Sequence, residues 1–511
     1  MASISSYSKQ LRRLWHIHRQ FKNTSVPPTV PLRWMNTHRV RSPIQRICSQ
    51  CCRASYPSRT LATIPKGDQK KDLMFSSDFK PDIDLDFLAQ NAEVIADRIS
   101  HRKGKIDVHE VLKKMKEFQL IQEDVHDVQL RLQTDIDKGL NTKELESMLK
   151  EKKNQLDRAQ NDFYRIAVAI PNSIHPDVPL TEDADPVLIE EINEKRSFDF
   201  PIKGHVELGE DLDIIRLKNL GHTTGHRSYF LKGAGSMLED ALVRFTLDRL
   251  IKNHGFKIIK VPDLIKPVVF VSIEACGMRT EGLHTQVYPL SPEYHNSDLW
   301  LAGTAEVGIA GYLMNKTIPM AELPLRIAAV SRCYRAETAH SADARGLYRV
   351  HQFTKVEMFC VAANESGKES EQIHQELVGI ERELFSDLGL HFQILDMPAH
   401  DLGAPAYRKF DCEAWMPHRK AYGEVSSTSN CTDFQSRRLH IQYKPSPESQ
   451  AKYAHTLNGT ACAVPRLIIA ILENNQQRDG SITIPEPLQP YMDGMREITR
   501  PASGKLHFTR L

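Results

Sequence analysis

Hydrophobic side chains recur every three or four residues over two consecutive stretches in the first half of the chain. They fall at Val111, Met115, Phe118, Val125, Val128, Leu132 and Ile136, and then at Leu145, Leu149, Leu156, Ala159, Phe163, Ile166 and Ile170. This spacing places apolar side chains on one face of an α-helix. Asp137-Lys138-Gly139 separates the stretches, and Asn141 with Glu144 resembles a capping box. The pattern predicts an antiparallel helical hairpin within 105–170, after a short amphipathic helix over 83–102.

Helices of about 30 residues would make an arm of about 45 Å. Such an arm is either a dimerisation coiled coil or a lever that reaches a large partner. Residues 105–170 hold 12 basic and 13 acidic side chains, so binding to RNA would require basic residues gathered on one side. Lys150, Lys152 and Lys153 are one candidate cluster and the basic run over 101–105 is another. A solvated charged face remains the alternative.

After the predicted hairpin, residues 171–186 contain four prolines and are typical of a linker. From about residue 200 the pattern becomes one of helices alternating with β-branched runs. These runs are Phe256–Val261, Leu325–Ser331, Val350–Val361, His391–Leu395 and His440–Gln442. The chain has no GxxxxGK[ST] and no strand-linked GxGxxG. If it uses ATP, it does so without either of these phosphate-binding loops.

The charge of the chain is unevenly distributed. The whole chain holds 67 Lys and Arg against 65 Asp and Glu, but residues 1–67 hold 12 of the basic residues and none of the acidic ones. The remainder therefore has 55 basic and 65 acidic residues, a net charge of −10. An Arg-rich, acid-free N-terminus with interleaved apolar residues is typical of a mitochondrial transit peptide. A basic arm that binds nucleic acid is the alternative.

Composition excludes several other classes of protein. No apolar run approaches the 18 or more residues that a membrane span needs, so we expect no membrane insertion. Nine cysteines, widely scattered after residue 52, do not make a disulfide framework. The 22 histidines form no clustered pair, so we expect no zinc site.

Four segments in the C-terminal half carry residues suited to binding and catalysis. They are LWLAGTAE with Thr304 and Glu306; CYRAET with Arg335 and Glu337, followed by RGLYRVHQFTKVEMF; GEVSSTSNCTDFQSRR with Glu424 and Ser427; and HTLNGTACAVPRLIIAILE with Asn458, Thr460 and Arg466. Singly they are weak signals. An Arg-x-Glu is most often a surface ion pair, a Ser/Thr-rich turn a helix cap, and an Asn-Gly a turn.

Together and in this order, the segments resemble the motifs of the seryl-tRNA synthetases, which belong to class II. The resemblance covers nearly everything after the basic N-terminus, and the residues of the motifs are most similar to those of the animal mitochondrial branch. HGFKIIKVPDL resembles motif 1, CYRAET with RVHQFTKVE resembles motif 2, and NGTACAVPR resembles motif 3. The resemblance implies an α+β fold, with a class II antiparallel-sheet catalytic domain behind an N-terminal helical hairpin that binds tRNA. It also implies a homodimer formed through motif 1.

The resemblance implies that the chain activates L-serine with ATP and transfers it to the 3′-terminal adenosine of tRNA(Ser). Arg335 would bind the α-phosphate and Arg466 the γ-phosphate, because a guanidinium makes paired hydrogen bonds to phosphate. Glu424 and Ser427 would hold Mg²⁺, a cation that prefers oxygen ligands. The implied catalytic residues are Arg335, Glu424 and Arg466. The implied ATP-binding residues are Arg335, Ala336, Glu337, Val350, Phe353, Glu424, Val425, Ser426, Ser427 and Arg466.

For serine, the resemblance implies a pocket with two anionic groups for the substrate ammonium and polar groups for its hydroxyl. A site that hydrogen-bonds a hydroxyl rejects alanine, because its own polar groups would be left unpaired. On their own, Phe353 is more typical of a core residue and Glu357 of a charge on a strand face. The implied serine-binding residues are Thr304, Ala305, Glu306, Glu357, Asn458 and Thr460.

Motif 3 departs from the family pattern, because Ala461, Cys462, Ala463, Val464 and Pro465 stand where glycines are usual before Arg466. We expect a tighter turn that keeps the arginine. The alternative to an enzyme is a catalytically silent paralogue that binds RNA or protein. The expected location is the mitochondrial matrix. The expected organisation is a transit peptide over 1–62, a tRNA-binding domain over 63–175, a catalytic domain over 176–490 and a basic tail over 491–511.

Overall fold

The computed structural model describes residues 80–102, 106–181, 183–266, 276, 278, 286–291, 299–337 and 346–500. The predicted transit peptide lies outside the described residues, as do residues 501–511 of the predicted tail and the loop 338–345 within motif 2. All of the described residues belong to one compact unit that spans Asp72–Leu511.

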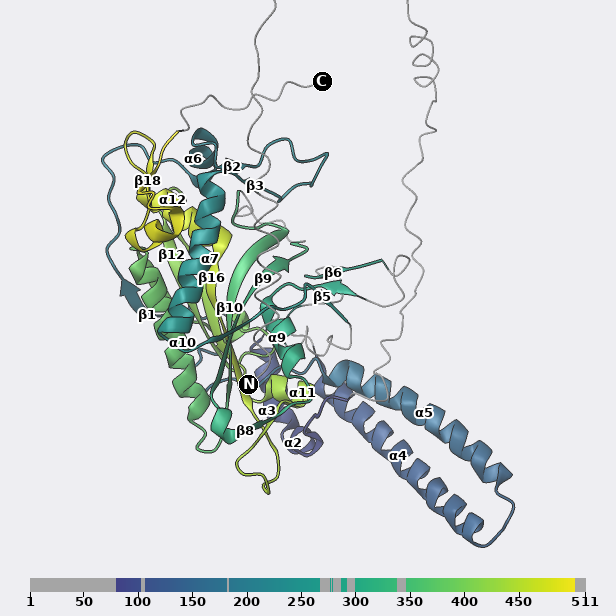
Figure 1. Ribbon diagram of the computed structural model, residues 1–511. Coiled ribbons are helices and arrows are strands. Elements are labelled where there is room, and N and C mark those ends of the chain that lie inside the picture. The colour runs from purple at the N-terminus through teal and green to yellow at the C-terminus, as the bar shows by residue number, and fades with distance from the viewer. Residues whose placement is uncertain are drawn as a thin grey trace, which may run out of the picture. The chain divides into compact units, whose positions relative to one another are not determined.

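Four helices form the N-terminal part of this unit. Two short ones, α2 (Leu85–Gln90) and α3 (Ala92–Ser100), precede two long ones, α4 (Val108–Asp137) and α5 (Lys143–Ala167). The long helices lie side by side and run in opposite directions (Figure 1). Their shared apolar residues include Phe118 and Phe163, whose rings stack with centroids 5.8 Å apart. The three- and four-residue spacing in the sequence therefore corresponds to the faces that these helices bury.

The boundaries of these helices differ from the predicted ones in two places. The stretch predicted as one helix over 83–102 is divided at Asn91, whose side chain donates to the carbonyl oxygen of Phe87. Helix α5 begins after Thr142, so the predicted capping box of Asn141 and Glu144 is wrong. Instead, Thr142 Oγ1 donates to Glu146 one turn further along the helix, at 2.7 Å.

Arg102, part of the basic run proposed for RNA binding, is buried and unable to reach a partner. Its guanidinium donates to four backbone carbonyl oxygens, those of Asn172, Ser173, Gly403 and Ala406, at 2.7–3.1 Å. Burial lowers its pKa to about 10. Arg102 therefore joins the helical N-terminal part to the C-terminal part, whereas residues 103–105 of the same run lie outside the described residues.

The C-terminal part is organised around one eight-stranded sheet of order β1-β11-β12-β13-β16-β10-β9-β4. Every neighbouring pair is antiparallel except β4 and β9. A mostly antiparallel sheet with helices on its faces is an α+β arrangement, as predicted. The strands are β1 (Val187–Ile192), β4 (Lys257–Ile259), β9 (Leu325–Tyr334), β10 (Gln352–Ala362), β11 (Phe392–Asp396), β12 (Arg408–Met416), β13 (Ala421–Asn430) and β16 (His455–Ala463).

Helices cover both faces of this sheet. Helices α7 (Ala234–Lys252), α10 (Glu369–Asp387) and α12 (Val464–Asn475) pack on one face and form the largest hydrophobic core. Helix α9 (Ala305–Leu313) packs on the other face. Along β10, Val356, Met358 and Cys360 enter the first core, whereas Phe359 enters the second. This alternation directs Phe353, Lys355 and Glu357 to the face of the sheet on which α9 lies.

Smaller elements complete the part of the chain that the structure describes. These elements are α6 (His205–Asp211), α11 (Phe434–Leu439), β2 (Ile215–Arg216), β3 (Phe230–Leu231), β5 (Leu264–Ile265), β6 (Tyr288–Pro289), β7 (Trp300–Leu301), β8 (Thr317–Pro319), β14 (Gln442–Lys444), β15 (Lys452–Tyr453), β17 (Ile482–Thr483), β18 (Glu497–Ile498), and the 3₁₀ helices Met320–Glu322, Ala399–Asp401 and Glu486–Met492. None of the helices in the described ranges is both long and apolar enough to cross a bilayer.

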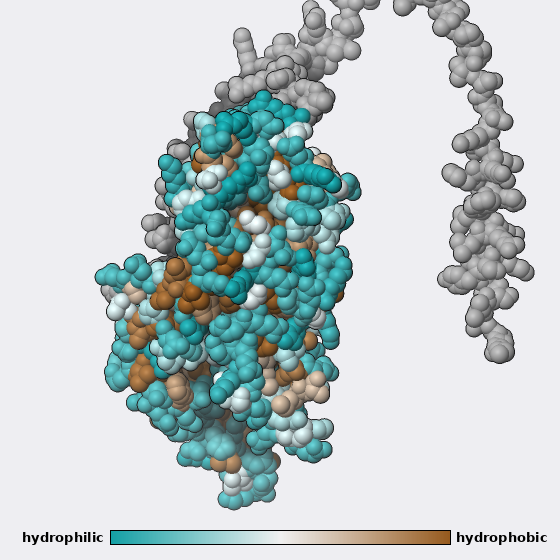
Figure 2. All heavy atoms as spheres, turned by 90° about the vertical axis from the view of Figure 1, so that its left-hand side faces the viewer, coloured by the Kyte–Doolittle hydropathy of each residue, from teal (hydrophilic) through white to brown (hydrophobic). Residues whose placement is uncertain are grey.

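Strand β1 is an exposed edge of the large sheet. The side of the molecule on which it lies is mostly hydrophilic, with islands of hydrophobic surface (Figure 2). Val187, Leu188 and Ile189 of this strand are each about half exposed. Glu190 pairs with Arg382 of α10 beside them. Charged residues on an edge strand oppose unwanted pairing with another sheet.

Candidate active site

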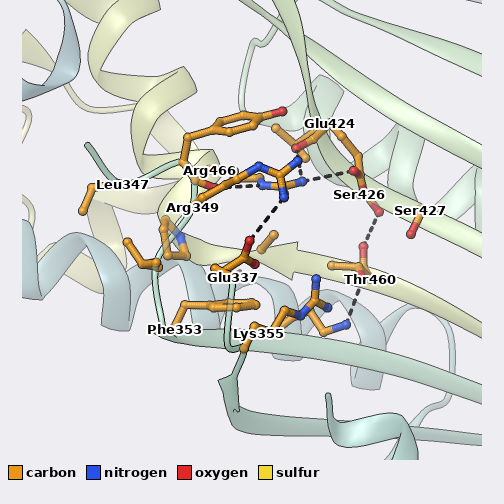
Figure 3. A pocket seen from close by; sticks show the side chains of 16 residues that line it. Glu337, Leu347, Arg349, Phe353, Lys355, Glu424, Ser426, Ser427, Thr460 and Arg466 are labelled. Atoms are coloured by element: carbon orange, nitrogen blue, oxygen red, sulfur yellow. Dashed lines mark hydrogen bonds and ion pairs between the residues drawn. The ribbon is translucent and has the colours of Figure 1, made fainter. Parts of the chain in front are cut away.

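A pocket opens over the middle of the large sheet, between β10, β13 and the first turn of α12 (Figure 3). The sheet order places β16 between β10 and β13, which brings distant motifs together. Nine of the ten residues predicted to bind ATP line this pocket: Arg335, Glu337, Val350, Phe353, Glu424, Val425, Ser426, Ser427 and Arg466. Ala336 is not among the lining residues, and its backbone N–H donates to the carbonyl oxygen of Gln286.

Three arginines and a lysine line the pocket, and the motifs supply two of the arginines, Arg335 and Arg466. Arg335 directly follows β9, and Arg466 lies in the first turn of α12. Each guanidinium lies near an aromatic ring: Arg335 is 5.4 Å from the centroid of Phe353, and Arg466 is 4.6 Å from that of Tyr348. Contact with a ring face holds a guanidinium in place while its N–H edge stays available to an anion. The pocket is therefore suited to phosphate groups.

The unusual motif 3 still delivers its arginine to the pocket. Strand β16 ends at Ala463 and α12 begins at Val464, so no loop residue separates them. Pro465 occupies the first turn of the helix, where its missing N–H costs no hydrogen bond. The Arg466 guanidinium donates to the carbonyl oxygen of Glu424 at 2.9 Å. Ala463 has φ −87°, so the turn needs no glycine at this position.

A β-bulge explains how Glu424 and Ser427 share one side of β13. Residues three apart on a regular strand point to opposite faces. Here Glu424 pairs with Glu413 and Ser426 with Cys412, so Val425 is an extra residue in the ladder. The bulge turns Val425 into the core and leaves Glu424 and Ser427 both lining the pocket.

Glu424 and Ser427 are the oxygen donors available for the predicted Mg²⁺. Burial alone would raise the pKa of Glu424, but the charges of Arg466, Lys409 and Arg335 outweigh it and lower that pKa. Its carboxylate lies 3.2 Å from Arg466. Mg²⁺ is usually held by one or two protein oxygens together with water and substrate phosphates. An ionised carboxylate and a hydroxyl beside a pocket suited to phosphate groups fit that requirement.

Phe353 is not a core residue, although an alternating strand would allow it. Its side chain is half-buried and lines the pocket on the same face of β10 as Lys355. The large cores on the two faces of the sheet do not include it. A partly exposed ring beside Arg335 offers a surface on which an aromatic base can stack.

The residues predicted to bind serine form a second, deeper cluster next to this pocket. Thr304 caps α9 and its hydroxyl donates to Glu357 at 3.2 Å. The Asn458 amide donates to Glu306 at 2.8 Å, and Thr460 Oγ1 lies 3.5 Å from Glu357. Ala305 is buried beside them at the start of α9. Strands β10 and β16 and helix α9 thus bring all six predicted residues to one place.

The charges in this cluster are arranged unequally. Glu357 forms an ion pair with Lys355, whose ammonium also donates to Thr460. Glu306 instead accepts hydrogen bonds from two neutral amides, those of Gln435 at 2.6 Å and Asn458 at 2.8 Å. Burial and the nearby charge of Glu357 raise the pKa of Glu306 to about 7. A buried acidic pair next to hydroxyl and amide groups is suited to a small substrate that carries an ammonium.

Comparison with known proteins places this geometry in a family. Residues 288–475 match the class II core domain of tRNA synthetases (G, H, P, S and T). A serine–tRNA ligase of Treponema denticola is 38% identical over 429 residues, which is 80% of this chain and 98% of that protein. The chain belongs to the serine–tRNA ligase family.

Among mitochondrial members of the family, the serine–tRNA ligase of mouse is 49% identical over 349 residues. The match covers 68% of this chain and 66% of the mouse protein, slightly less than two thirds of its length. A crystal structure of the seryl-tRNA synthetase from Pyrococcus horikoshii, complexed with ATP, has a TM-score of 0.68 at 30% identity. The structural match covers 82% of this chain and 100% of the Pyrococcus horikoshii chain, so the fold is that of a serine–tRNA ligase.

Several residues that shape this serine–tRNA ligase site were not predicted from the sequence. Lys355 could have been found, because it lies between Phe353 and Glu357 at the two-residue spacing of one strand face. Gln435 had no such signal, since it contacts Glu306 from a short helix 129 residues further along the chain. Tyr348 and Arg349 line the pocket wall just after the loop 338–345.

Proposed function

We propose that this chain is a mitochondrial serine–tRNA ligase. It activates L-serine with ATP to form seryl-adenylate and pyrophosphate, and then transfers serine to the 3′-terminal adenosine of tRNA(Ser). The observation that carries the proposal is the adjacency of two sites, a pocket lined by three arginines and a cluster with two buried carboxylates. The first suits a nucleotide triphosphate and the second an amino acid.

In the first step, a carboxylate oxygen of serine attacks the α-phosphorus of ATP, and the bond to the β-phosphate oxygen breaks to release pyrophosphate. This displacement needs no protein nucleophile, because positioning and charge neutralisation suffice. Arg335 is assigned to the α-phosphate and Arg466 to the γ-phosphate. Phe353 stacks on adenine, and Glu337 orients the base. Mg²⁺ held by Glu424 and Ser427 would neutralise further phosphate charge.

Serine occupies the deeper cluster, where its carboxylate faces the ATP pocket. Glu306 and Glu357 accept hydrogen bonds from its ammonium, with Thr304 supporting Glu357. Asn458 and Thr460 contact its hydroxyl. Without that hydroxyl, alanine would leave buried polar groups unpaired, which is the physical basis for its rejection.

In the second step, a hydroxyl of the terminal ribose of tRNA(Ser) attacks the acyl carbon, and AMP leaves. We assign tRNA binding to the α4/α5 hairpin, whose Lys150 and Lys153 are exposed. Binding at a distance from the pocket requires a long, rigid element, and these two helices provide one.

We also propose that two copies of the chain form the working enzyme and that it acts in the mitochondrial matrix. Within the motif 1 stretch, Ile258 of β4 and Leu264 of β5 are 43% and 46% exposed. An edge strand with exposed apolar side chains is suited to burial against a second copy. The matrix assignment depends on the acid-free N-terminus and on the mitochondrial relatives.

Exchange of labelled pyrophosphate into ATP tests the activation step. The chain should catalyse exchange that depends on serine, and Arg335→Ala should reduce kcat/KM by at least about 100-fold, because a charge contact to the transferring phosphate is lost. Absence of serine-dependent exchange in the correctly folded chain would contradict the proposal. The alternative of a silent paralogue has no support from the relatives, which are described as ligases.

A further inference from the structure

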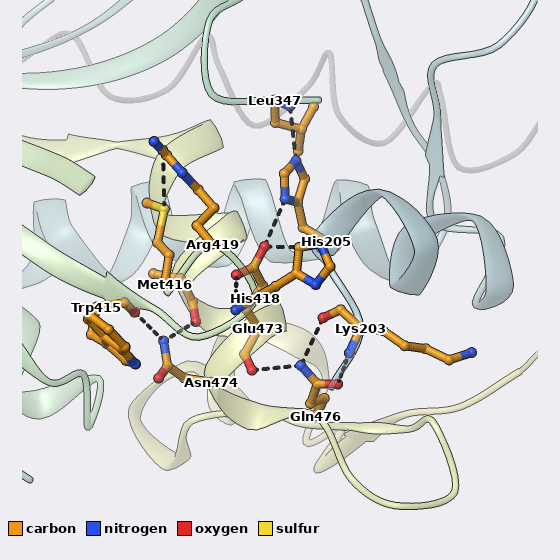
Figure 4. A network of polar contacts seen from close by, with 11 residues as sticks. Lys203, His205, Leu347, Trp415, Met416, His418, Arg419, Glu473, Asn474 and Gln476 are labelled. Carbon is orange, nitrogen blue, oxygen red and sulfur yellow. Dashed lines mark hydrogen bonds and ion pairs between the residues drawn. The ribbon is translucent and has the colours of Figure 1, made fainter. Parts of the chain in front are cut away.

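A buried hydrogen-bond network lies behind one wall of the ATP pocket and centres on His205 and Glu473 (Figure 4). His205 is the first residue of α6, and Glu473 lies near the end of α12. His205 Nδ1 is 3.0 Å from Glu473 Oε1, and the two side chains are 9% and 0% exposed. Glu473 is the last residue of the segment HTLNGTACAVPRLIIAILE, His205 lies outside the four segments that the sequence singled out, and neither residue lines the pocket.

The contacts of this pair determine where the histidine carries its proton. The backbone N–H of Leu347 donates to His205 Nε2 at 3.2 Å, so Nε2 must be an acceptor. The proton therefore resides on Nδ1 and is donated to Glu473. Glu473 also accepts from the backbone N–H groups of His205 and His418, each at 3.2 Å. A neutral histidine thus joins α12 to the segment that contains Leu347.

Gly346 shows how closely that segment approaches the histidine. Its φ is +71°, a conformation that favours glycine. A Cβ atom placed there would overlap His205 Nε2, and Val206 is also close to it. The close contact between the imidazole and the backbone thus depends on the absence of a side chain at residue 346.

The segment held by His205 forms part of the pocket. Leu347, Tyr348, Arg349 and Val350 all line it. The Tyr348 carbonyl oxygen accepts a hydrogen bond from Arg466 Nε at 3.4 Å. Arg466 lies seven residues before Glu473, which is about two turns of the same helix. The N-terminal end of α12 therefore contacts the pocket wall directly through Arg466. The C-terminal end contacts the same wall indirectly, through Glu473 and His205.

We propose that His205 is a positioning residue for ATP: together with Glu473 it fixes the Gly346–Val350 segment against α12 and so sets the wall of the nucleotide pocket. This inference rests on the proposed function, because it takes ATP as the ligand. His205 itself touches no substrate. Its loss should affect ATP binding and leave serine binding almost unchanged.

Two substitutions separate the two hydrogen bonds of the imidazole. In His205→Asn the amide reaches the position of Nδ1 and can donate to Glu473, but nothing accepts from Leu347. In His205→Gln the amide oxygen reaches the position of Nε2 and can accept from Leu347. We expect His205→Asn to raise KM for ATP about tenfold in serine-dependent exchange. His205→Gln should stay within about twofold of the unaltered chain, and KM for serine should change less than about twofold in both.

His391→Asn is the matched control, because His391 is also buried and its Nε2 lies 3.2 Å from a glutamate, Glu191, away from the pocket lining. It should leave KM for ATP unchanged. Gly346→Ala disrupts the same contact from the backbone side, because the added Cβ atom would overlap the imidazole. It should also raise KM for ATP about tenfold. This variant takes the place of His205→Asn if His205→Asn does not fold. The inference is overturned if His205→Asn and Gly346→Ala leave KM for ATP unchanged or raise KM for ATP and KM for serine equally.

The ATP dissociation constant is measured by direct titration in addition to the pyrophosphate-exchange assay. Failure of this inference can then be distinguished from failure of the proposed function. If the unaltered chain binds ATP without serine-dependent exchange, the proposed function fails. The ATP dissociation constants of the His205 variants then still test the positioning role. A dissociation constant for His205→Asn equal to that of the unaltered chain would contradict it.

Discussion

The two buried carboxylates of the serine cluster differ in what balances their charge. Glu357 has an ammonium beside it, that of Lys355, whereas Glu306 accepts hydrogen bonds from the neutral amides of Gln435 and Asn458. Burial and the charge of Glu357 raise the pKa of Glu306 to about 7, while the Gln435 hydrogen bond, Lys355 and Cys276 act to lower it. Because only the ionised form attracts an ammonium, we predict that Glu306 makes serine binding sensitive to pH near neutrality.

The affinity for serine should therefore fall as pH decreases through about 7, where Glu306 takes up a proton. Gln435→Leu removes a hydrogen bond that favours the ionised form, so the midpoint should move to higher pH. At pH 7, kcat/KM for serine should fall about tenfold. The measurement is KM for serine between pH 6 and 8.5 in pyrophosphate exchange, with KM for ATP as the internal control.

A purely structural role for Gln435 would give a different result. The variant would then lose activity equally at every pH, and the midpoint for serine would not move. Thr456→Val is a suitable comparison, because Thr456 donates to Gln435 Oε1 at 2.6 Å without touching Glu306. It should shift the midpoint in the same direction by a smaller amount, because it loosens Gln435 and leaves its amide in place.

At this scale the sequence predicted most of the charged and hydroxyl residues of the site but not the residues that orient them. Arg335, Glu424 and Arg466 could be proposed from their motifs and line the pocket. The neighbours of Gln435 and His205 come from distant segments, and their roles appear only when the sheet and α12 are assembled. No local pattern encodes such contacts.

At the scale of elements, β13 and β16 bring the two halves of the site together, and Gly459 allows them to pair. A Cβ atom at Gly459 would lie 2.8 Å from Thr428 Cγ2 and 3.1 Å from Met358 Cε. Gly459→Ala should therefore lower the free energy of unfolding by about 1–3 kcal/mol. Urea unfolding followed by circular dichroism measures this change.

Gly379→Ala is the control for that substitution. Gly379 is exposed within α10, and nothing lies within 4 Å of a Cβ atom built there. Alanine should raise the free energy of unfolding by about 0.5–1 kcal/mol, because glycine weakens a helix interior. Equal effects of the two substitutions would show that the space around Gly459 does not limit the pairing of β13 with β16.

The pattern of the sequence predicted long helices better than polar central strands. The spacing of apolar residues predicted α4 and α5, and most of the predicted helix ends lie within a few residues of the observed ones. Asn458-Gly459, which alone is typical of a turn, lies inside β16. The hydroxyl-rich run after Glu424 is strand β13, in the middle of the sheet. Strands that line a polar pocket lack the apolar alternation by which a strand is recognised.

At the scale of the whole molecule, the charge distribution constrains how tRNA can bind. Residues after 67 have a net charge of −10, yet the proposed partner is a polyanion. Affinity must therefore come from local basic groups rather than from overall charge. Arg102 is buried among carbonyl oxygens, which leaves exposed residues such as Lys150 and Lys153 on α5 to provide it.

Formation of seryl-tRNA tests the central claim most directly, because it requires the pocket, the serine cluster and the arm together. The measurement is transfer of labelled serine to a mitochondrial tRNA(Ser) transcript in the presence of ATP and Mg²⁺. We predict multiple turnovers with serine, none detectable with alanine, and a loss of at least about 100-fold in Arg466→Ala. A correctly folded chain that forms no seryl-tRNA, or an Arg466→Ala variant as active as the unaltered chain, would contradict the account.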